Sequence, residues 1–181
     1  MLRFTRPTVL RALATVLLPC ASACLARAPR HPAVDVAREL RPERFFAGPT
    51  SGEGELVVRG RALQRFRVDG HGRTEPDGTF RLEQTIAMGD AAATTRTWRL
   101  RRLDARTYAA TLSDARGPVS ADVDGNRFHL RYEIRRPDVV MEQWLYLQPD
   151  GRTVRNIATI TVLGVPWARM SESITRGAAV P

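Results

Sequence analysis

Arg127-Phe128-His129-Leu130-Arg131-Tyr132-Glu133-Ile134 decides the fold, because apolar and polar residues alternate along it without interruption. Successive side chains of an extended strand point to opposite faces, so the four apolar residues of this stretch share one face. About ten short segments between Gly54 and Thr175 repeat the alternation. Turn residues separate them, most clearly at Pro76-Asp77-Gly78, Asp124-Gly125-Asn126 and Pro149-Asp150-Gly151. These features predict an all-β fold.

The order of the segments predicts how the sheet is connected. No helical pattern of useful length interrupts them, so consecutive strands are expected to pair as hairpins. Closing such a sheet on itself removes its edges, which predicts a single antiparallel up-and-down β-barrel of about 8–10 strands. Pro42 to Phe46 is expected to form one helical turn, with Phe45-Phe46 either plugging an open barrel end or acting as a simple hydrophobic latch.

The N-terminal region has the layout of a secretory signal. Three arginines and no acidic residue precede the apolar run Ala12 to Pro19, and small residues follow before Cys24. Ala21-Ser22-Ala23-Cys24 resembles a bacterial lipobox, in which the cysteine is acylated; the alternative is ordinary cleavage near Ala26 or Ala28. The expected organisation is therefore a signal peptide at 1–23, a tether at 24–41, the barrel at 42–176 and a tail at 177–181.

Location follows from the same region. Lipidation at Cys24 predicts an exported protein anchored in the cell envelope, and Leu25, which is not Asp, favours the periplasmic side of the outer membrane. The apolar run is shorter than the ~20 residues that a membrane-spanning helix needs, so no such helix is predicted. Cys20 and Cys24 are the only cysteines, which excludes a disulfide framework in the remainder of the chain.

The charge is strongly positive but evenly distributed. The net charge is +9, and all 28 basic residues are arginines. They alternate with Asp and Glu on the polar faces of the predicted strands, and no recognised nucleic-acid motif accompanies them, so no nucleic-acid partner is expected. Anionic lipid is a more plausible target for the excess charge, and the sequence names no protein partner.

Polar residues in the apolar phase are the only leads to a site. Gln64, Gln84, Asn156 and Glu172 break the pattern, while Glu142 and Trp144 lie in a segment that is partly apolar on both faces. The predicted site is an apolar lumen with a few convergent polar groups, formed by Gln84, Trp98, Glu142, Trp144, Asn156 and Glu172. The alternative is a satisfied polar cluster that fixes the register of the strands.

Support for catalysis is thin. Glu142 and Glu172 are the one pair of carboxylates that the pattern offers for general acid and base work. His31, His71 and His129 are expected to be solvated, and none has a metal-ligand spacing with another ligand residue, so neither a metal nor another cofactor is predicted. No nucleophile elbow and no phosphate-binding loop is present.

Several short stretches of the chain, taken together, form a recognisable pattern: Arg44 to Gly48, Arg65 to Val68, Arg96 to Leu100, Gly125-Asn126, Trp144 to Leu147, Asn156 to Ala158 and Leu163-Gly164. Through these stretches, Pro42 to Arg176 resembles the bacterial lipoproteins grouped as domain of unknown function 3833. Two positions depart from the family's pattern: Glu142-Gln143 stands where an acidic pair is usual, and Ile157 where Arg is usual. The resemblance implies a lipocalin-like fold and an envelope location, without an activity.

Three functional hypotheses follow from these observations. The first is a lipid-anchored barrel, facing the periplasm, that binds a small apolar ligand or lipid. The second is an envelope scaffold or accessory protein without a ligand, and the third is an enzyme that uses lumenal carboxylates.

Overall fold

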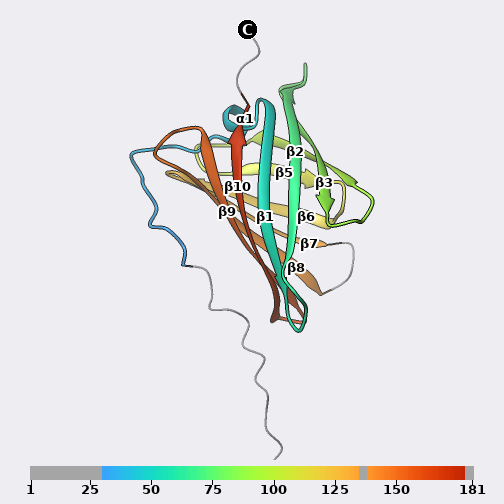
Figure 1. The fold of residues 1–181 in the computed structure, drawn as a ribbon. Helices are drawn as coiled ribbons and strands as arrows, with labels where there is room; N and C mark the ends of the chain where they lie inside the picture. Colours follow the sequence, from blue (N-terminus) through green and yellow to red (C-terminus); the bar gives the residue numbers. More distant parts are fainter. Residues whose placement is uncertain (1–29, 135–137, 178–181) are drawn as a thin grey trace, which may run out of the picture.

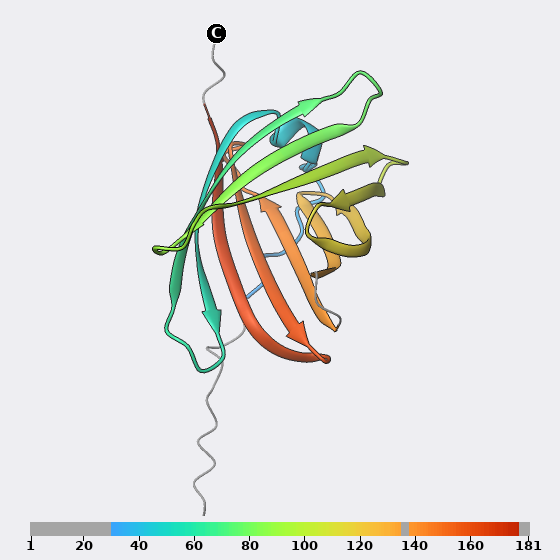
Figure 2. The same ribbon diagram turned by 90° about the vertical axis from the view of Figure 1, so that its right-hand side faces the viewer.

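The computed structural model describes residues 30–134 and 138–177. These residues form ten antiparallel strands in one closed barrel (Figures 1 and 2). Each strand pairs with its neighbours in sequence, and β1 pairs with β10 to close the barrel, so the predicted up-and-down topology is confirmed. The strands are β1 (Gly48–Val58), β2 (Gln64–Thr74), β3 (Phe80–Met88), β4 (Thr94–Arg102), β5 (Tyr108–Leu112), β6 (Ala115–Asp124), β7 (Arg127–Ile134), β8 (Val139–Leu147), β9 (Thr153–Val162) and β10 (Val165–Arg176).

The predicted turns connect the strands, and aspartate side chains stabilise two of these turns. Asp77 accepts hydrogen bonds from the backbone and the hydroxyl of Thr79, at 2.9 and 3.1 Å. Asp150 does the same for Thr153, at 2.9 and 2.7 Å. Local side-chain bonds of this kind favour a turn over a continued strand. The turns therefore fix where each hairpin reverses.

The inward faces of the strands form the core that the alternation predicts. Phe80, Leu82, Trp98, Leu100, Phe128, Leu130 and Tyr132 are all buried there. The one helix of the described residues, α1 (Pro42–Phe45), lies at the upper end of the barrel in Figure 1. Phe45 and Phe46 are buried in the core cluster, so they plug this end as the sequence suggested. No described helix has the length and apolar character that crossing a bilayer requires.

The sequence predicted a tether over residues 24–41, and the described part of this segment, from residue 30, contacts the barrel. Leu40 is only 1% exposed, and its backbone N–H donates to the carbonyl of Gly125 at 2.9 Å. Asp35 donates its N–H to Asn126 Oδ1 at 2.8 Å and accepts the N–H of Asn126 at 3.0 Å. This part of the segment is therefore fixed to the barrel at the β6–β7 turn. The predicted signal peptide, the predicted lipidation residue Cys24 and the last four residues lie outside the described part of the chain.

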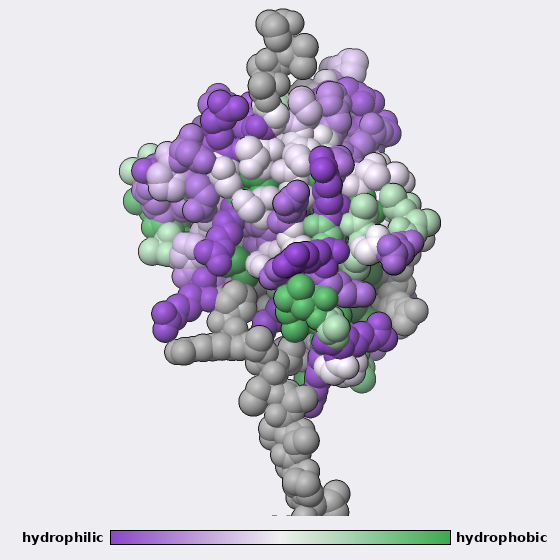
Figure 3. Space-filling model, in the orientation of Figure 1, coloured by the Kyte–Doolittle hydropathy of each residue, from purple (hydrophilic) through white to green (hydrophobic). Residues whose placement is uncertain are grey.

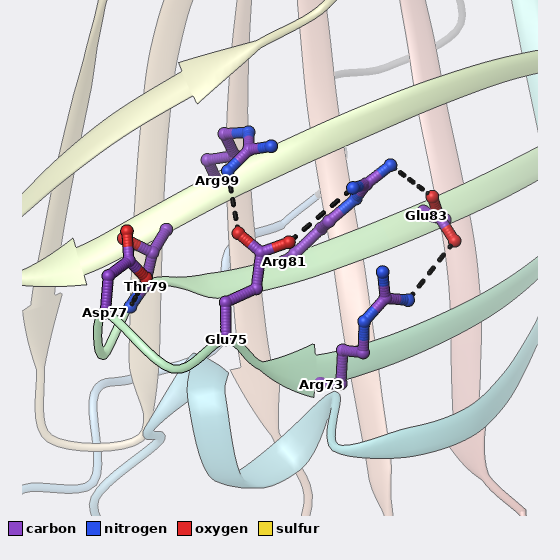
Figure 4. A network of polar contacts seen from close by, with 7 residues as sticks. All are labelled: Arg73, Glu75, Asp77, Thr79, Arg81, Glu83 and Arg99. Atoms are coloured by element: carbon purple, nitrogen blue, oxygen red, sulfur yellow. Dashed lines mark hydrogen bonds and ion pairs between the residues drawn. The ribbon is translucent and has the colours of Figure 1, made fainter.

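Ion pairs cover the outer face of β2, β3 and β4. Glu75 binds Arg99 at 2.7 Å and Arg81 at 3.5 Å, and Glu83 binds Arg81 at 2.5 Å and Arg73 at 3.6 Å (Figure 4). Exposed pairs of this kind contribute about 0–1 kcal/mol each. They nevertheless show that this part of the barrel wall carries its arginines next to compensating carboxylates.

Candidate functional site

A layer of polar side chains lies inside the barrel. Its members share two properties: each belongs to the inward phase of its strand, and each contacts another member or packs beside one. They are Gln84 on β3, Arg96 and Trp98 on β4, Tyr132 on β7, Gln143 on β8, Asn156 on β9 and Glu172 on β10. We call this set the lumenal polar layer.

One half of the layer is centred on Gln84. Its side-chain oxygen accepts a hydrogen bond from Trp98 Nε1 at 3.0 Å and another from Arg96 Nε at 2.8 Å. The Arg96 guanidinium also lies 5.8 Å from the centroid of the Trp98 ring, within the range of a cation–π interaction. Gln84 and Trp98 are buried, whereas Arg96 is partly exposed. The guanidinium is thus held at the border between the core and the solvent.

The other half is a chain of amides that ends at a carboxyl group. Asn156 Nδ2 donates to Gln143 Oε1 and to Glu172 Oε2, both at 3.0 Å. Gln143 Nε2 in turn donates to the Tyr132 hydroxyl at 2.7 Å. Asn156 Oδ1 is buried and has no hydrogen-bond partner within the described structure. A donor supplied by a water molecule or a ligand would satisfy this oxygen.

Burial shifts the pKa values of two members of the layer. Loss of solvent raises the pKa of Glu172, opposed by the hydrogen bond from Asn156 and by the charge of Arg96. Burial also raises the pKa of Tyr132 to about 12, so this phenol stays neutral. In the described residues, no carboxylate oxygen lies within 4.0 Å of the Arg96 nitrogens. The layer therefore holds a cation without an ion-pair partner.

Space at the layer is small. The cavity that it lines has a volume of about 30 Å³, which is enough for one or two water molecules. Glycines on β1 create what room there is: a Cβ at Gly52 would collide with Glu172 Oε1, and one at Gly54 with the Phe66 ring. An enclosed acyl chain has no place beside the layer. Only the terminal atoms of a ligand fit there.

The barrel end opposite α1 is more open. Apolar residues of the inward phase are only partly buried in this region, among them Leu56, Ile86, Met88, Ile160 and Met170. They follow the layer along β1, β3, β9 and β10, away from the Phe45-Phe46 plug. A ligand whose polar end reaches Arg96 from this side would find apolar side chains along the rest of its length.

Two predicted site residues lie on the wrong side of the wall. Glu142 and Trp144 belong to the outer face of β8, because the inward phase of that strand is Met141, Gln143 and Leu145. The prediction that they share the lumen with Gln84, Trp98, Asn156 and Glu172 is therefore wrong. Because Glu142 and Glu172 occupy opposite faces, they cannot act together on one lumenal substrate.

Side chains from other parts of the chain pack on the outer face of β8. The His31 ring packs edge-on against Trp144, with centroids 4.6 Å apart. The His129 ring also stacks on Trp144, with centroids 5.4 Å apart. The nitrogens of His129 lie 3.0 Å from Asp122 Oδ1 and 2.9 Å from Glu142 Oε1. His31 and His129 are thus packed rather than simply solvated as predicted, and burial lowers the pKa of His31. His71 is exposed.

Sequence reasoning missed three members of the layer. Arg96 lies in phase with Trp98 and Leu100, and Gln143 in phase with Met141 and Leu145, so the alternation already marked both as inward. Tyr132 was assigned to the interior but not to the site. Gln64, the fourth polar residue in the apolar phase, is exposed at the start of β2. Within the described residues, no group of three or more His, Cys, Asp and Glu side chains is arranged to hold a metal ion.

Comparison with known families identifies the chain. The model of the family described as "Protein of unknown function (DUF3833)" matches residues 18–176. The chain belongs to this family. The resemblance noted from the sequence is thereby confirmed, and the family's description supplies no activity. No curated protein matches this DUF3833 member by sequence.

Solved structures confirm the fold of this DUF3833 member. The S-type phycobiliprotein lyase CPES from Guillardia theta aligns with a TM-score of 0.60 at 10% identity, covering 76% of this chain and 91% of the lyase. A protein of unknown function from the DUF3598 family of Nostoc punctiforme aligns with a TM-score of 0.57 at 12% identity, covering 77% of this chain and 50% of that one. At these identities the likeness concerns the fold alone.

Proposed function

We propose that this protein is an exported, lipid-anchored barrel that binds a small amphiphilic molecule, with an acidic polar end at Arg96 and an apolar tail at the open end of the barrel. This is a narrower form of the binding hypothesis that the sequence suggested. The similarity in fold to a phycobiliprotein lyase is compatible with a barrel that handles a small molecule. The proposal itself depends on the lumenal polar layer.

The observation that carries the proposal is the position of Arg96. Its guanidinium lies on the inward face, bound by Gln84 and without a carboxylate partner in the described residues. An inward-facing cation beside an apolar core favours a partner of opposite charge, and Arg96, which is partly exposed, can be reached by one from the solvent. Burial raises the pKa of Glu172, the acidic member of the layer, and no Glu172 oxygen lies within 4.0 Å of the Arg96 nitrogens, so Glu172 does not form an ion pair with this guanidinium. An anionic ligand would.

The size of the cavity sets which part of the ligand enters. About 30 Å³ admits the oxygens of a carboxylate or a similar group, but no tail. Guanidinium groups bind such anions through charge-assisted hydrogen bonds. The tail would lie along partly exposed side chains such as Ile86, Met88 and Met170. A long-chain fatty acid is therefore the simplest probe of the site.

The experiment compares two arginines of β4 that face opposite ways. Arg96→Gln removes the inward guanidinium, and Arg101→Gln removes an exposed one on the outer face. A charged hydrogen bond contributes about 1.5–3 kcal/mol, so Arg96→Gln is expected to weaken binding of a fluorescent fatty acid by about tenfold or more. Arg101→Gln should bind it as the unaltered protein does.

A matched fatty alcohol completes the test. It lacks the negative charge, so its affinity should be low and nearly unaffected by Arg96→Gln. Equal binding of the acid and the alcohol, or equal binding by both arginine variants, would instead make the layer a cluster that fixes strand register. No saturable binding of either probe would remove the proposal altogether.

Anchoring at Cys24 is supported by the signal layout of the sequence, although this residue lies outside the described structure. The intact mass of protein purified from its own membrane tests it. A mass equal to Cys24–Pro181 plus acyl groups is expected, whereas an unmodified chain starting near Ala26 or Ala28 would contradict the anchor.

A further inference from the structure

Exposed apolar residues gather at the end of the barrel opposite α1. Leu163 is 75% exposed, Val165 50%, Leu63 48% and Trp167 44%. Leu163, Val165 and Trp167 belong to the β9–β10 turn and the start of β10, and Leu63 to the β1–β2 loop. The two hairpins are neighbours, since the N–H of Arg59 donates to the carbonyl of Trp167 at 2.9 Å. We call these four residues the hairpin tip.

The tip forms a visible patch. In Figure 3 an apolar area lies low on the face shown, over the ends of β1 and β10, with hydrophilic side chains around it. Isolated apolar residues on a surface are ordinary, but a cluster on adjacent loops indicates an interaction site. The core does not explain the patch, because none of these side chains belongs to the core cluster or packs against it.

The conformation and exposure of Leu163 are further evidence for an interaction site. It occupies a two-residue hairpin turn with Gly164, and both have positive φ, at 51° and 76°. Such turns favour Asn-Gly, and a branched residue such as Leu adopts positive φ only at a cost. Leu163 thus serves neither the turn, which Asn would suit better, nor the core, from which it is largely exposed. A contact outside the protein would account for it.

The charges around the tip favour one kind of partner. Arg59 and Arg61 are exposed in the β1–β2 loop, and neither takes part in an ion pair among the described residues. Arg65, 85% exposed, has only a loose contact of 3.6 Å with Glu55. These arginines differ from those of the outer wall in Figure 4, which carboxylates compensate. The tip therefore combines apolar side chains with available positive charge.

We infer that the hairpin tip inserts shallowly into the interface of a lipid bilayer that carries anionic headgroups. Leu63, Leu163 and Val165 would enter the acyl boundary, Trp167 would lie at headgroup level, and Arg59 and Arg61 would bind phosphates. Docking in this way would turn the open end of the barrel toward the lipid. The inference depends on neither ligand binding at Arg96 nor the identity of the ligand.

Trp167 provides the measurement. The protein purified from its membrane is reconstituted with vesicles that contain brominated lipids, which quench only tryptophans in contact with the bilayer. Trp98 is buried, and Trp144 is partly buried against His31 and His129 on the barrel wall rather than at the hairpin tip, so the quenched emission should come from Trp167 and be absent in Trp167→Phe. It should be strong with phosphatidylglycerol and weak with phosphatidylcholine vesicles. The anchor is common to all samples and cannot produce the difference.

Two further variants exclude trivial explanations. Leu163→Asn suits the turn better and should be at least as stable as the unaltered protein, yet lose most of the quenching, so unfolding cannot explain the loss. Arg59→Gln with Arg61→Gln should lower vesicle affinity about fivefold for each arginine, whereas the control pair Arg73→Gln with Arg99→Gln on the outer wall should leave it unchanged.

Three results would overturn the inference. The first is equal quenching with both lipids and in every tip variant. The second is no quenching of Trp167 in any vesicle. The third is burial of Trp167 without lipid at high protein concentration, together with a dimer that Leu163→Asn abolishes, which would assign the tip to a second copy of the chain. Fatty acid binding that depends on Arg96 could persist in each case, so the two proposals fail separately.

Discussion

Glu172 shows at the scale of a residue how the lumenal layer is balanced. The carboxyl is buried, accepts one hydrogen bond from Asn156, and has its pKa raised mainly by loss of solvent. Because Gly52 has no side chain, there is room beside it for the Glu172 carboxyl group. A buried carboxyl that is harder to ionise than in the unfolded chain reduces stability above the unfolded pKa. Such a group is kept at the expense of stability, which is consistent with a role in a site.

The pH dependence of stability tests this assignment. Below the ordinary glutamate pKa of 4.5, Glu172 is protonated in both the folded and the unfolded state. As the pH rises above 4.5, the unfolded chain loses this proton while the folded protein keeps it, so stability falls until the folded pKa is passed. Glu172→Gln lacks this loss. Its free energy of unfolding should exceed that of the unaltered protein at pH 7 by about 1.4 kcal/mol for each unit of pKa difference.

Urea unfolding at pH 4 and pH 7 measures the effect, with the exposed Glu53→Gln as control. The gap between Glu172→Gln and the unaltered protein should open only at the higher pH. A gap of the same size at both pH values would mean that the variant acts through packing rather than through ionisation.

Single residues were predicted unequally well. Gln84, Asn156 and Glu172 were found because each is a polar residue at an apolar position of its strand. Trp98 was found because it belongs to the apolar face of a regular alternation. Glu142 and Trp144 were misplaced because β8 is partly apolar on both faces, so alternation does not tell which face is inward there. Arg96 was missed although its phase was readable: arginines dominate the polar faces of this chain, so one inward arginine did not stand out.

At the scale of the element, residues 30–41 behave as part of the barrel. Gly125 has a positive φ of 54°, and a Cβ there would collide with the carbonyl of Asp35. Asn126 receives the N–H of Asp35 and donates its own side-chain amide to the carbonyl of Leu147 at 3.0 Å. The Gly125-Asn126 pair therefore makes both a hairpin turn and a docking point for the segment. The sequence predicted the hairpin turn but not the contact with residues 30–41.

Replacing Asn126 tests the docking. Asn126→Ala removes two side-chain hydrogen bonds of a buried amide and leaves the groups of Asp35 and Leu147 without these partners. We expect a loss of about 2 kcal/mol in the free energy of unfolding, measured by urea, and faster amide exchange at Asp35 and Leu40. Gln64→Ala, which removes an exposed amide, should change neither quantity. Unaltered exchange at both residues would show that the segment does not depend on this contact.

At the scale of the whole molecule, regular alternation and turn residues were enough to predict the architecture. They specify hairpins between neighbouring strands, and closure follows from pairing β1 with β10. What alternation cannot specify is how full the interior is, or which outer surface is covered by another segment. The small cavity and the covered face of β8 depend on side-chain volumes and on long-range contacts. For this reason the ligand hypothesis now places only the polar end of the ligand inside the barrel.

The most direct test of the central claim is mass spectrometry of what the barrel carries when purified from the cells that produce it. Organic extraction leaves covalently bound acyl chains on the protein, so any released molecule was bound without a covalent bond. The account predicts about one acidic amphiphile per protein from the unaltered chain and from Arg101→Gln, and little or none from Arg96→Gln. An empty unaltered protein, or the same amphiphile in equal amount from Arg96→Gln, would contradict it.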